Sequence, residues 1–517
     1  MAKSPDQHQA GEELSPARTR LILAVVGLAL MAVISAVAGL NVALPSLARD
    51  TGATQTQLTW IVDSYTVVFA GLLLFAGALG DRFGRRLLLS IGLVIFGSAA
   101  ALGLFVTDPD QLIVVRILMG VGAAAIMPTT LSVITTSFPE AERPRAIGVW
   151  VGIAGGGAVL GLFATGLLLE FFPWTSFFGL NVALAILSLI GVLAVVPTSV
   201  DADPPALDVV GAALSLVAVG AFVYGIIEGP TRGWSDPITV AALAVGIAAG
   251  IAFVLWELRL EHPLLDPRLF RLRGFSAGTL TITVQFMSSF GFFFIALQYL
   301  QFVTGRSPLE AALALLPLPF ILLPTARRAP LLAERMGGFG RLGPIGLVSM
   351  AIGFLVFSQL QVDSPYWFFV LGLLLFGFGM GLAGTPATTA ITGSLSRSKQ
   401  GVASAVNDTA RELGSALGIA IFGSLLNQGY RDGMAEAVAG LPPAVAERVL
   451  GSIAFTGSPE IAQFGEAGKR LVDQARVAFV GGVSDAVVVG SVILVVGAVG
   501  VAILAPRAQR DQVVETD

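Results

Sequence analysis

Residues 80–86 read Gly-Asp-Arg-Phe-Gly-Arg-Arg and form a short charged break between two long apolar runs, at 58–79 and 87–106. A helix of about 20 apolar residues crosses the roughly 30 Å hydrocarbon layer of a bilayer, so each run can span a membrane. Glycine permits a tight reversal of the backbone, and arginines stay in water on the cytoplasmic side. The segment therefore predicts two antiparallel transmembrane helices joined by a cytoplasmic turn.

Similar apolar runs recur along nearly the whole sequence, which is 55% hydrophobic and only 12% charged. Average soluble domains carry roughly 25% charged residues, so the medium around this chain is lipid. The first run is too long for the core of a signal peptide and is expected to stay as an uncleaved span. We expect fourteen spans near 21–45, 58–79, 87–106, 111–135, 146–169, 175–197, 208–228, 238–257, 275–303, 309–330, 342–361, 366–393, 400–427 and 476–505.

Charge in the connecting segments predicts the orientation, because cytoplasmic loops are enriched in lysine and arginine. If the N-terminus lies inside, the inner segments hold clusters such as 82–86, 143–145, 259–273, 327–341 and 397–399, and the outer loops before the last one hold only Arg49, Arg232 and Arg306. Both termini are therefore expected in the cytoplasm. The long outer segment 428–475 is expected to form short amphipathic helices outside the membrane.

The sequence lacks the residues that several classes of protein need for their function. The chain has no cysteine, no basic stripe beside aromatic residues, no His-Glu-x-x-His segment and no phosphate-binding Gly-x-x-x-x-Gly-Lys-Ser/Thr loop. We therefore expect no enzyme, no metal site, no cofactor, no nucleic-acid partner and no ATP-driven transport by this chain alone.

The charged break has a second, weaker copy. Residues 333–337 read Ala-Glu-Arg-Met-Gly and repeat the order small residue, acid, arginine, any residue, glycine that begins at Gly80. The simple interpretation is a basic cytoplasmic loop with a glycine turn. The full first copy is more specific and resembles the signature loop of the major facilitator superfamily.

Four further segments resemble the fourteen-span drug:proton antiporter branch of that superfamily. They are Asn-Val-Ala-Leu-Pro at 41–45, Trp-Ile-Val-Asp-Ser-Tyr at 60–65, Arg116 with Gly-Val-Gly-Ala at 120–123, and Asn-Asp-Thr-Ala-Arg-Glu-Leu-Gly at 407–414. The resemblance implies an all-α membrane protein with two six-helix bundles that alternate access to a midplane cavity. The implied parts are a cytoplasmic tail 1–20, a first bundle 21–198, an inserted helix pair 199–273, a second bundle 274–505 that includes the loop 428–475, and a tail 506–517.

The resemblance also implies a conformational-switch loop in two copies. Its residues are Gly80, Asp81, Arg82, Gly84, Arg85 and Arg86 in the first copy, and Glu334, Arg335 and Gly337 in the second.

Two positions depart from the pattern of the branch. An acidic residue usually precedes the Asn-Val-Ala-Leu-Pro string, but residues 35–38 read Ser-Ala-Val-Ala. The Gly-Pro of span five is also missing, because Leu162 follows Gly161. The chain therefore lacks two features that the branch usually has for proton antiport.

Charges inside the hydrocarbon layer cost about 2.5 to 3.5 kcal/mol on insertion scales, so each one is a functional candidate. Asp63 is either an interfacial acid at the outer mouth or a proton or cation site, and Arg116 is either a fixed countercharge or an arginine that extends to the interface. Asp408, Arg411 and Glu412 share one helical face, where Arg411 can serve both acids as a structural staple or in coupling. Glu228 ends span seven and is expected at the interface.

Glycines spaced four apart predict close helix contacts in spans five and thirteen, which we expect to meet across the two halves. Gly152, Gly156 and Gly161 form the first set, and Gly414 and Gly418 the second. Span nine carries an aromatic, sparsely polar surface at 285–299 that suits a hydrophobic or amphiphilic ligand.

The sequence favours a secondary transporter in the inner membrane of a bacterium. We expect it to be monomeric, to be coupled to protons and to export a hydrophobic or amphiphilic small molecule. An uncoupled carrier or a lipid flippase that has lost proton coupling is the alternative.

Overall fold

The computed structural model describes residues 16–139, 142–199, 207–261, 263–395 and 400–506, and these residues form helices and loops without a strand. The predicted tails lie largely outside the described residues, as does segment 396–399. A helix occupies each of the fourteen ranges predicted to span the membrane. The described elements therefore agree with an all-α membrane protein.

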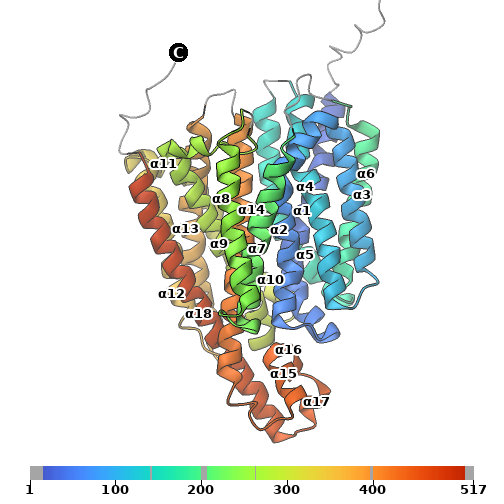
Figure 1. The fold of residues 1–517 in the computed structure, drawn as a ribbon, viewed down its shortest axis with the longest axis vertical. Coiled ribbons are helices and arrows are strands. Elements are labelled where there is room, and N and C mark those ends of the chain that lie inside the picture. Colours follow the sequence, from blue (N-terminus) through green and yellow to red (C-terminus); the bar gives the residue numbers. More distant parts are fainter. Residues whose placement is uncertain (1–15, 140–141, 200–206, 262, 396–399, 507–517) are drawn as a thin grey trace, which may run out of the picture.

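The first group of helices runs up and down and packs around α1 and α4 (Figure 1). Helix α1 packs on α5 and α6, while α4 packs on α2 and α3. Small residues bring backbones close, since a Cβ on Gly120 would lie 2.6 Å from the Tyr65 carbonyl. The helices are α1 (Pro16–Thr51), α2 (Gln55–Phe83), α3 (Arg85–Gly103), α4 (Pro109–Ser137), α5 (Arg143–Phe171) and α6 (Ser176–Val195).

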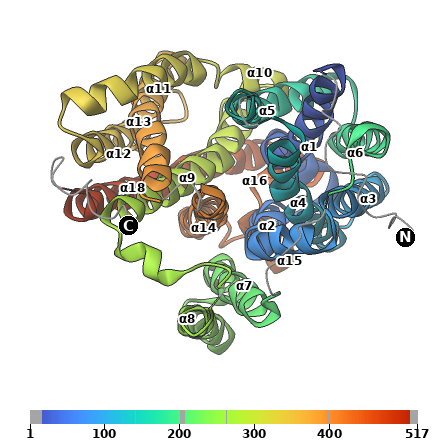
Figure 2. The same ribbon diagram turned by 90° about the horizontal axis from the view of Figure 1, so that it is seen from above.

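The second group surrounds α9, with α13, α14 and α18 against it and α12 beyond (Figure 2). Its centre is a phenylalanine cluster in which the Phe292 ring stacks on Phe357 at 4.6 Å between centroids. The helices are α9 (Arg273–Gln298), η2 (Tyr299–Val303), α10 (Pro308–Leu313), α11 (Pro317–Arg335), α12 (Phe339–Phe357), α13 (Tyr366–Gly393), α14 (Gln400–Met434), α15 (Pro443–Gly451), α16 (Ile453–Thr456), α17 (Pro459–Ala462) and α18 (Glu466–Leu504).

A helix pair lies outside both groups, beside α2 and α14 (Figure 2). It consists of α7 (Val209–Arg232) and α8 (Pro237–Glu257), and a short helix η1 (Pro267–Arg271) leads on to α9. Helix α7 packs on α8 and also contacts both α2 and α14. The pair therefore bridges the two groups along one side.

The two ends of the bundle differ. Helices α14 and α18 project beyond the others and carry α15, α16 and α17, which lie at the bottom of Figure 1. We call this the loop end, and we call the opposite end, where α1 begins and α18 ends, the terminal end. The predicted outer segment 428–475 thus contains short helices, although the two long helices take up its first and last residues.

Twelve described helices are long and apolar enough to cross a membrane. Helix α14 is not among the twelve, and of α5 only the described stretch Gly156–Phe171 is included, as a shorter apolar helix. The count of fourteen spans, the orientation and the domain boundaries stay predictions. The span expected at 309–330 is broken between α10 and α11, and Pro317 begins the second piece.

Candidate functional site

The two groups of helices touch each other at the loop end. The side-chain amide of Gln301 donates to the Val42 carbonyl at 3.0 Å, and the Glu170 carboxylate accepts a hydrogen bond from the Ser307 hydroxyl at 2.5 Å. On the other side of the molecule, the Asn427 amide donates to the Thr56 hydroxyl at 3.0 Å. These contacts close the loop end on both sides of the interface.

The terminal end of the same interface is open along α5. A Cβ on Gly166 would lie 3.2 Å from the Cα of Leu309 in α10, so this face of α5 is packed at the loop end. Gly152 and Gly148 lie 14 and 18 residues earlier, about four and five helical turns along the same face. Both are exposed, and a Cβ on either would meet nothing within 4 Å. The structure is therefore closed at the loop end and splayed at the terminal end.

The expected meeting of spans five and thirteen is wrong in this structure. Gly414 and Gly418 of α14 face α9, where a Cβ on Gly414 would lie 2.5 Å from the Thr283 carbonyl and one on Gly418 would clash with the Met287 carbonyl. Gly161 faces Ser35 of α1, and Gly156, like Gly152, has open space beside it. Spacing predicts that a helix has a small face, but it does not identify the helix that packs there.

Arg116 lies fully buried between α4 and α2, with 0% of its surface exposed. Its Nε donates to the Ile61 carbonyl at 2.9 Å, and its guanidinium lies 4.1 Å from the centroid of the Tyr65 ring. The Tyr65 hydroxyl in turn donates to the Val33 carbonyl of α1 at 3.1 Å. The alternative in which Arg116 extends to the membrane surface is therefore wrong, and the guanidinium is a fixed buried charge that ties three helices together.

Asp63 is also 0% exposed, and neither carboxylate oxygen has a hydrogen-bond partner among the described residues. Thr59 and Val67, one turn before and one turn after it, both contact α14, at Gly423 and in an apolar cluster with Ala416. Helical geometry places Asp63 on that same face. Asp63 is thus a buried acid at the interface between the two groups, not an exposed acid at the outer mouth.

Arg411 and Asp408 form an ion pair on α14 with 3.8 Å between Nη1 and Oδ1. The guanidinium of Arg411 also lies 4.6 Å from the centroid of the Phe286 ring in α9. No ion pair joins Arg411 to Glu412 within 4.0 Å among the described residues, so Arg411 pairs with only one of the two acids that we expected it to serve. Instead, Glu412 lies within electrostatic range of the Tyr65 hydroxyl on α2.

These five charged residues extend across the interface. Arg116 and Asp63 belong to the first group, whereas Asp408, Arg411 and Glu412 belong to α14. If all five are ionised, three acids and two arginines leave one negative charge. A single proton would make the set neutral, which lowers the cost of holding it away from water.

The switch loop keeps its charge pair only in the first copy. Gly84 adopts φ +106° between α2 and α3, and the Arg85 guanidinium binds the Asp81 carboxylate at 2.8 Å. Arg86 donates to the Leu193 carbonyl of α6 at 2.6 Å. In the second copy, Gly337 also adopts a positive φ of +84°, but Glu334 and Arg335 are exposed and form no ion pair within the described part of the chain.

Glu228 lies at the loop end in α7, where the helix continues through Pro230 to Arg232. Its carboxylate accepts from the Trp60 indole at 2.9 Å and binds Arg232 at 3.1 Å. The structure does not bring Glu228 together with the buried charges.

The sequence did not predict Tyr65 as the partner of Arg116, although both residues lie in segments that resemble the antiporter branch.

Among the described residues, no group of three or more His, Cys, Asp or Glu side chains could hold a metal ion.

In a comparison with known protein families, residues 26–419 match the family described as "Major Facilitator Superfamily". The chain is 34% identical to the multidrug efflux pump LfrA of Mycolicibacterium smegmatis, over 94% of this chain and 97% of that protein. It is 33% identical to the puromycin resistance protein pur8 of Streptomyces alboniger, over 82% and 86% of the two chains. The methyl viologen resistance protein SmvA of Salmonella typhimurium is 32% identical over 91% and 95%.

Solved structures share the fold at lower identity. A bacterial homologue of the human lysosomal transporter Spinster, in an inward-facing and unoccupied conformation, superposes with a TM-score of 0.63 at 18% identity and covers 95% of this chain and 97% of that one. A D-xylose-proton symporter gives a TM-score of 0.57 at 15% identity, covering 95% and 99%.

Proposed function

The chain belongs to the major facilitator superfamily, and from that premise we propose that it exports hydrophobic or amphiphilic small molecules in exchange for protons. It is a multi-pass membrane transporter and not an enzyme. We place it in the cytoplasmic membrane of a bacterium as a monomer, with the terminal end in the cytoplasm, as the loop charges predict. The names of its relatives as efflux and resistance proteins support the direction and the class of substrate.

The observation that carries proton coupling is the buried, unpartnered carboxyl group of Asp63 at the contact between α2 and α14. An ionised carboxylate without a partner is costly in such a place, whereas the protonated form is neutral. The closed loop end is therefore compatible with Asp63 in its protonated form. Opening the loop end separates α2 from α14 and lets water reach the carboxylate.

This difference couples protons to the direction of opening. Protonation of Asp63 from the outside lets the loop end close and the terminal end open. Loss of the proton toward the cytoplasm, past the partly exposed Asp408 and Glu412, leaves a buried charge that favours opening of the loop end. A substrate bound in between is carried outward, and the acid in span two takes the place of the one missing from span one.

Proteoliposomes that hold the purified protein test the exchange. With ethidium as the probe, an imposed pH gradient should drive ethidium across the membrane, and collapsing the gradient should stop it. Asp63→Asn mimics the protonated acid permanently, so we expect gradient-driven ethidium movement to fall at least about tenfold, the equivalent of about 1.4 kcal/mol. Glu412→Gln should reduce it as well.

Asp363→Asn is the matched control, because Asp363 is an exposed acid in the loop between α12 and α13. It should transport ethidium like the unaltered protein. Transport that ignores the gradient, together with a silent Asp63→Asn, would instead identify an uncoupled carrier or a lipid flippase.

A further inference from the structure

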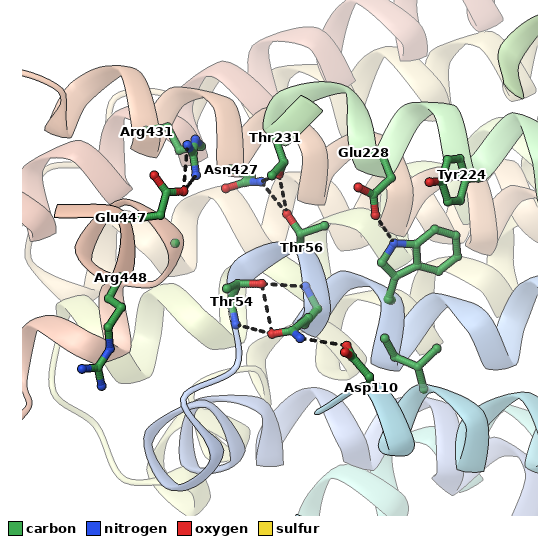
Figure 3. Close-up of a pocket in the computed structure, with 14 residues that line it drawn as sticks. Thr54, Thr56, Asp110, Tyr224, Glu228, Thr231, Asn427, Arg431, Glu447 and Arg448 are labelled. Atoms are coloured by element: carbon green, nitrogen blue, oxygen red, sulfur yellow. Dashed lines mark hydrogen bonds and ion pairs between the residues drawn. The ribbon is translucent and has the colours of Figure 1, made fainter. Parts of the chain in front are cut away.

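A cavity of about 630 Å³ lies at the loop end, away from the interface charges described above (Figure 3). Its walls come from α2 and α4 of the first group, from α7 of the inserted pair, and from α14 and α15 of the second group. Small-molecule sites typically measure about 300 to 1,000 Å³, so the cavity can hold a small organic ligand.

One wall of this cavity is aromatic and acidic. Trp60 of α2 and Tyr224 of α7 lie 5.8 Å apart between ring centroids, with their planes at 47°. The Glu228 carboxylate accepts from the Trp60 indole at 2.9 Å, which fixes the indole and increases the negative character of its ring face. Figure 3 shows Tyr224 and Glu228 on the same side of the cavity. Such a wall attracts cations.

The charges of the cavity do not balance. Arg431 pairs with Glu447 at 3.4 Å, Arg448 pairs with Glu460 at 2.7 Å, and Glu228 pairs with Arg232 at 3.1 Å. The carboxylate of Asp110 accepts only from the neutral Gln57 amide, at 2.8 Å, and no ion pair to it is present in the described part of the chain. One lining acid is therefore left without a countercharge.

We propose that this cavity binds a monovalent organic cation with an apolar or aromatic body, separately from the transport pathway. The charged group lies toward Asp110, and the apolar body packs on Trp60, Tyr224 and Ile113. Thr56 ties the cavity to α7 and α14 through hydrogen bonds of 2.8 Å to Thr231 and 3.0 Å to Asn427. The cavity in this form therefore belongs to the closed loop end, and a bound cation favours that state.

The absence of cysteine from the sequence allows a direct test. Ile113→Cys places one thiol at the cavity, where a membrane-impermeant maleimide should label it from the loop end. Benzyltrimethylammonium should slow the labelling with a saturable dependence on concentration, whereas benzenesulfonate, an anion of similar size, should not. A cysteine at Asp363, in the loop between α12 and α13, reports any unspecific effect.

Two second-site changes test the chemistry of the site. Asp110→Asn and Tyr224→Leu should each weaken protection by about fivefold, because they remove the free charge and part of the aromatic wall on which the apolar body packs. Asp63→Asn, which we expect to hold the loop end closed, should retain or strengthen the protection, which separates this site from the proposed proton coupling. The proposal fails if millimolar benzyltrimethylammonium gives no protection, or if Asp110→Asn and Tyr224→Leu both protect as well as the parent.

Discussion

At the scale of single residues, Arg116 makes two contacts through its planar guanidinium group that a lysine side chain could not make together. Its Nε binds the Ile61 carbonyl, and its plane lies over the Tyr65 ring. A lysine keeps the charge but loses the stacking, and its ammonium is more strongly hydrated. We expect Arg116→Lys to lower the free energy of unfolding by about 1 to 3 kcal/mol, seen as a lower apparent melting temperature of the purified protein.

Arg259→Lys provides the comparison, since Arg259 is exposed beyond the end of α8. Its melting temperature should match that of the unaltered protein. Equal melting temperatures for the two variants would mean that the contacts of Arg116 contribute nothing to stability.

The sequence identified Asp63 and Arg116 as costly intramembrane charges, because that cost depends only on the residue type and its place in an apolar run. It could not identify their surroundings. Arg116 pairs with a ring and a carbonyl, and Asp63 faces the opposite bundle, and both facts depend on how helices rotate about their axes. Neither is encoded in local spacing.

At the scale of elements, the face of α5 that carries Gly148, Gly152 and Gly166 is packed at one end and open at the other. Alternating access requires the open part to close against the second group when the loop end opens. A leucine at Gly152 fits the present structure but obstructs that closure. We expect Gly152→Leu to keep the apparent melting temperature and to reduce ethidium transport in proteoliposomes by about tenfold or more.

Gly481→Leu serves as the control, because Gly481 of α18 also has nothing within 4 Å of a Cβ. Its transport should stay normal. Normal transport by Gly152→Leu as well would show that this face of α5 never packs closely at the terminal end.

The positions of the helices were largely predictable, since apolar runs of about 20 residues have few alternatives in a bilayer. Their partners were less so. Residues Gly414 and Gly418 approach α9 rather than α5, and the span at 309–330 breaks before Pro317. Which helices pack together and where a span breaks depend on the arrangement of whole bundles. The length of apolar runs and the spacing of glycines do not predict that arrangement.

At the scale of the whole molecule, the inserted pair makes the two sides of the interface different. Helix α7 contacts both α2 and α14, so it covers the side on which Asp63 is buried. The side formed by α5 has no such cover at its terminal end, where Gly152 is exposed. The pair thus covers the side of the interface that holds the buried Asp63, and burial strengthens the electrostatic effect of a single proton.

The central claim is that the proton on Asp63 decides which end of the molecule is open. Spin labels on cysteines at Gln111 and Asp432, both exposed at the loop end, would measure the distance between α4 and α14 by pulsed electron resonance. The account predicts a short distance at low pH, a growing population of longer distances as the pH rises, and a short distance at every pH in Asp63→Asn. A distance distribution that does not change with pH, or that changes equally in Asp63→Asn, would contradict it.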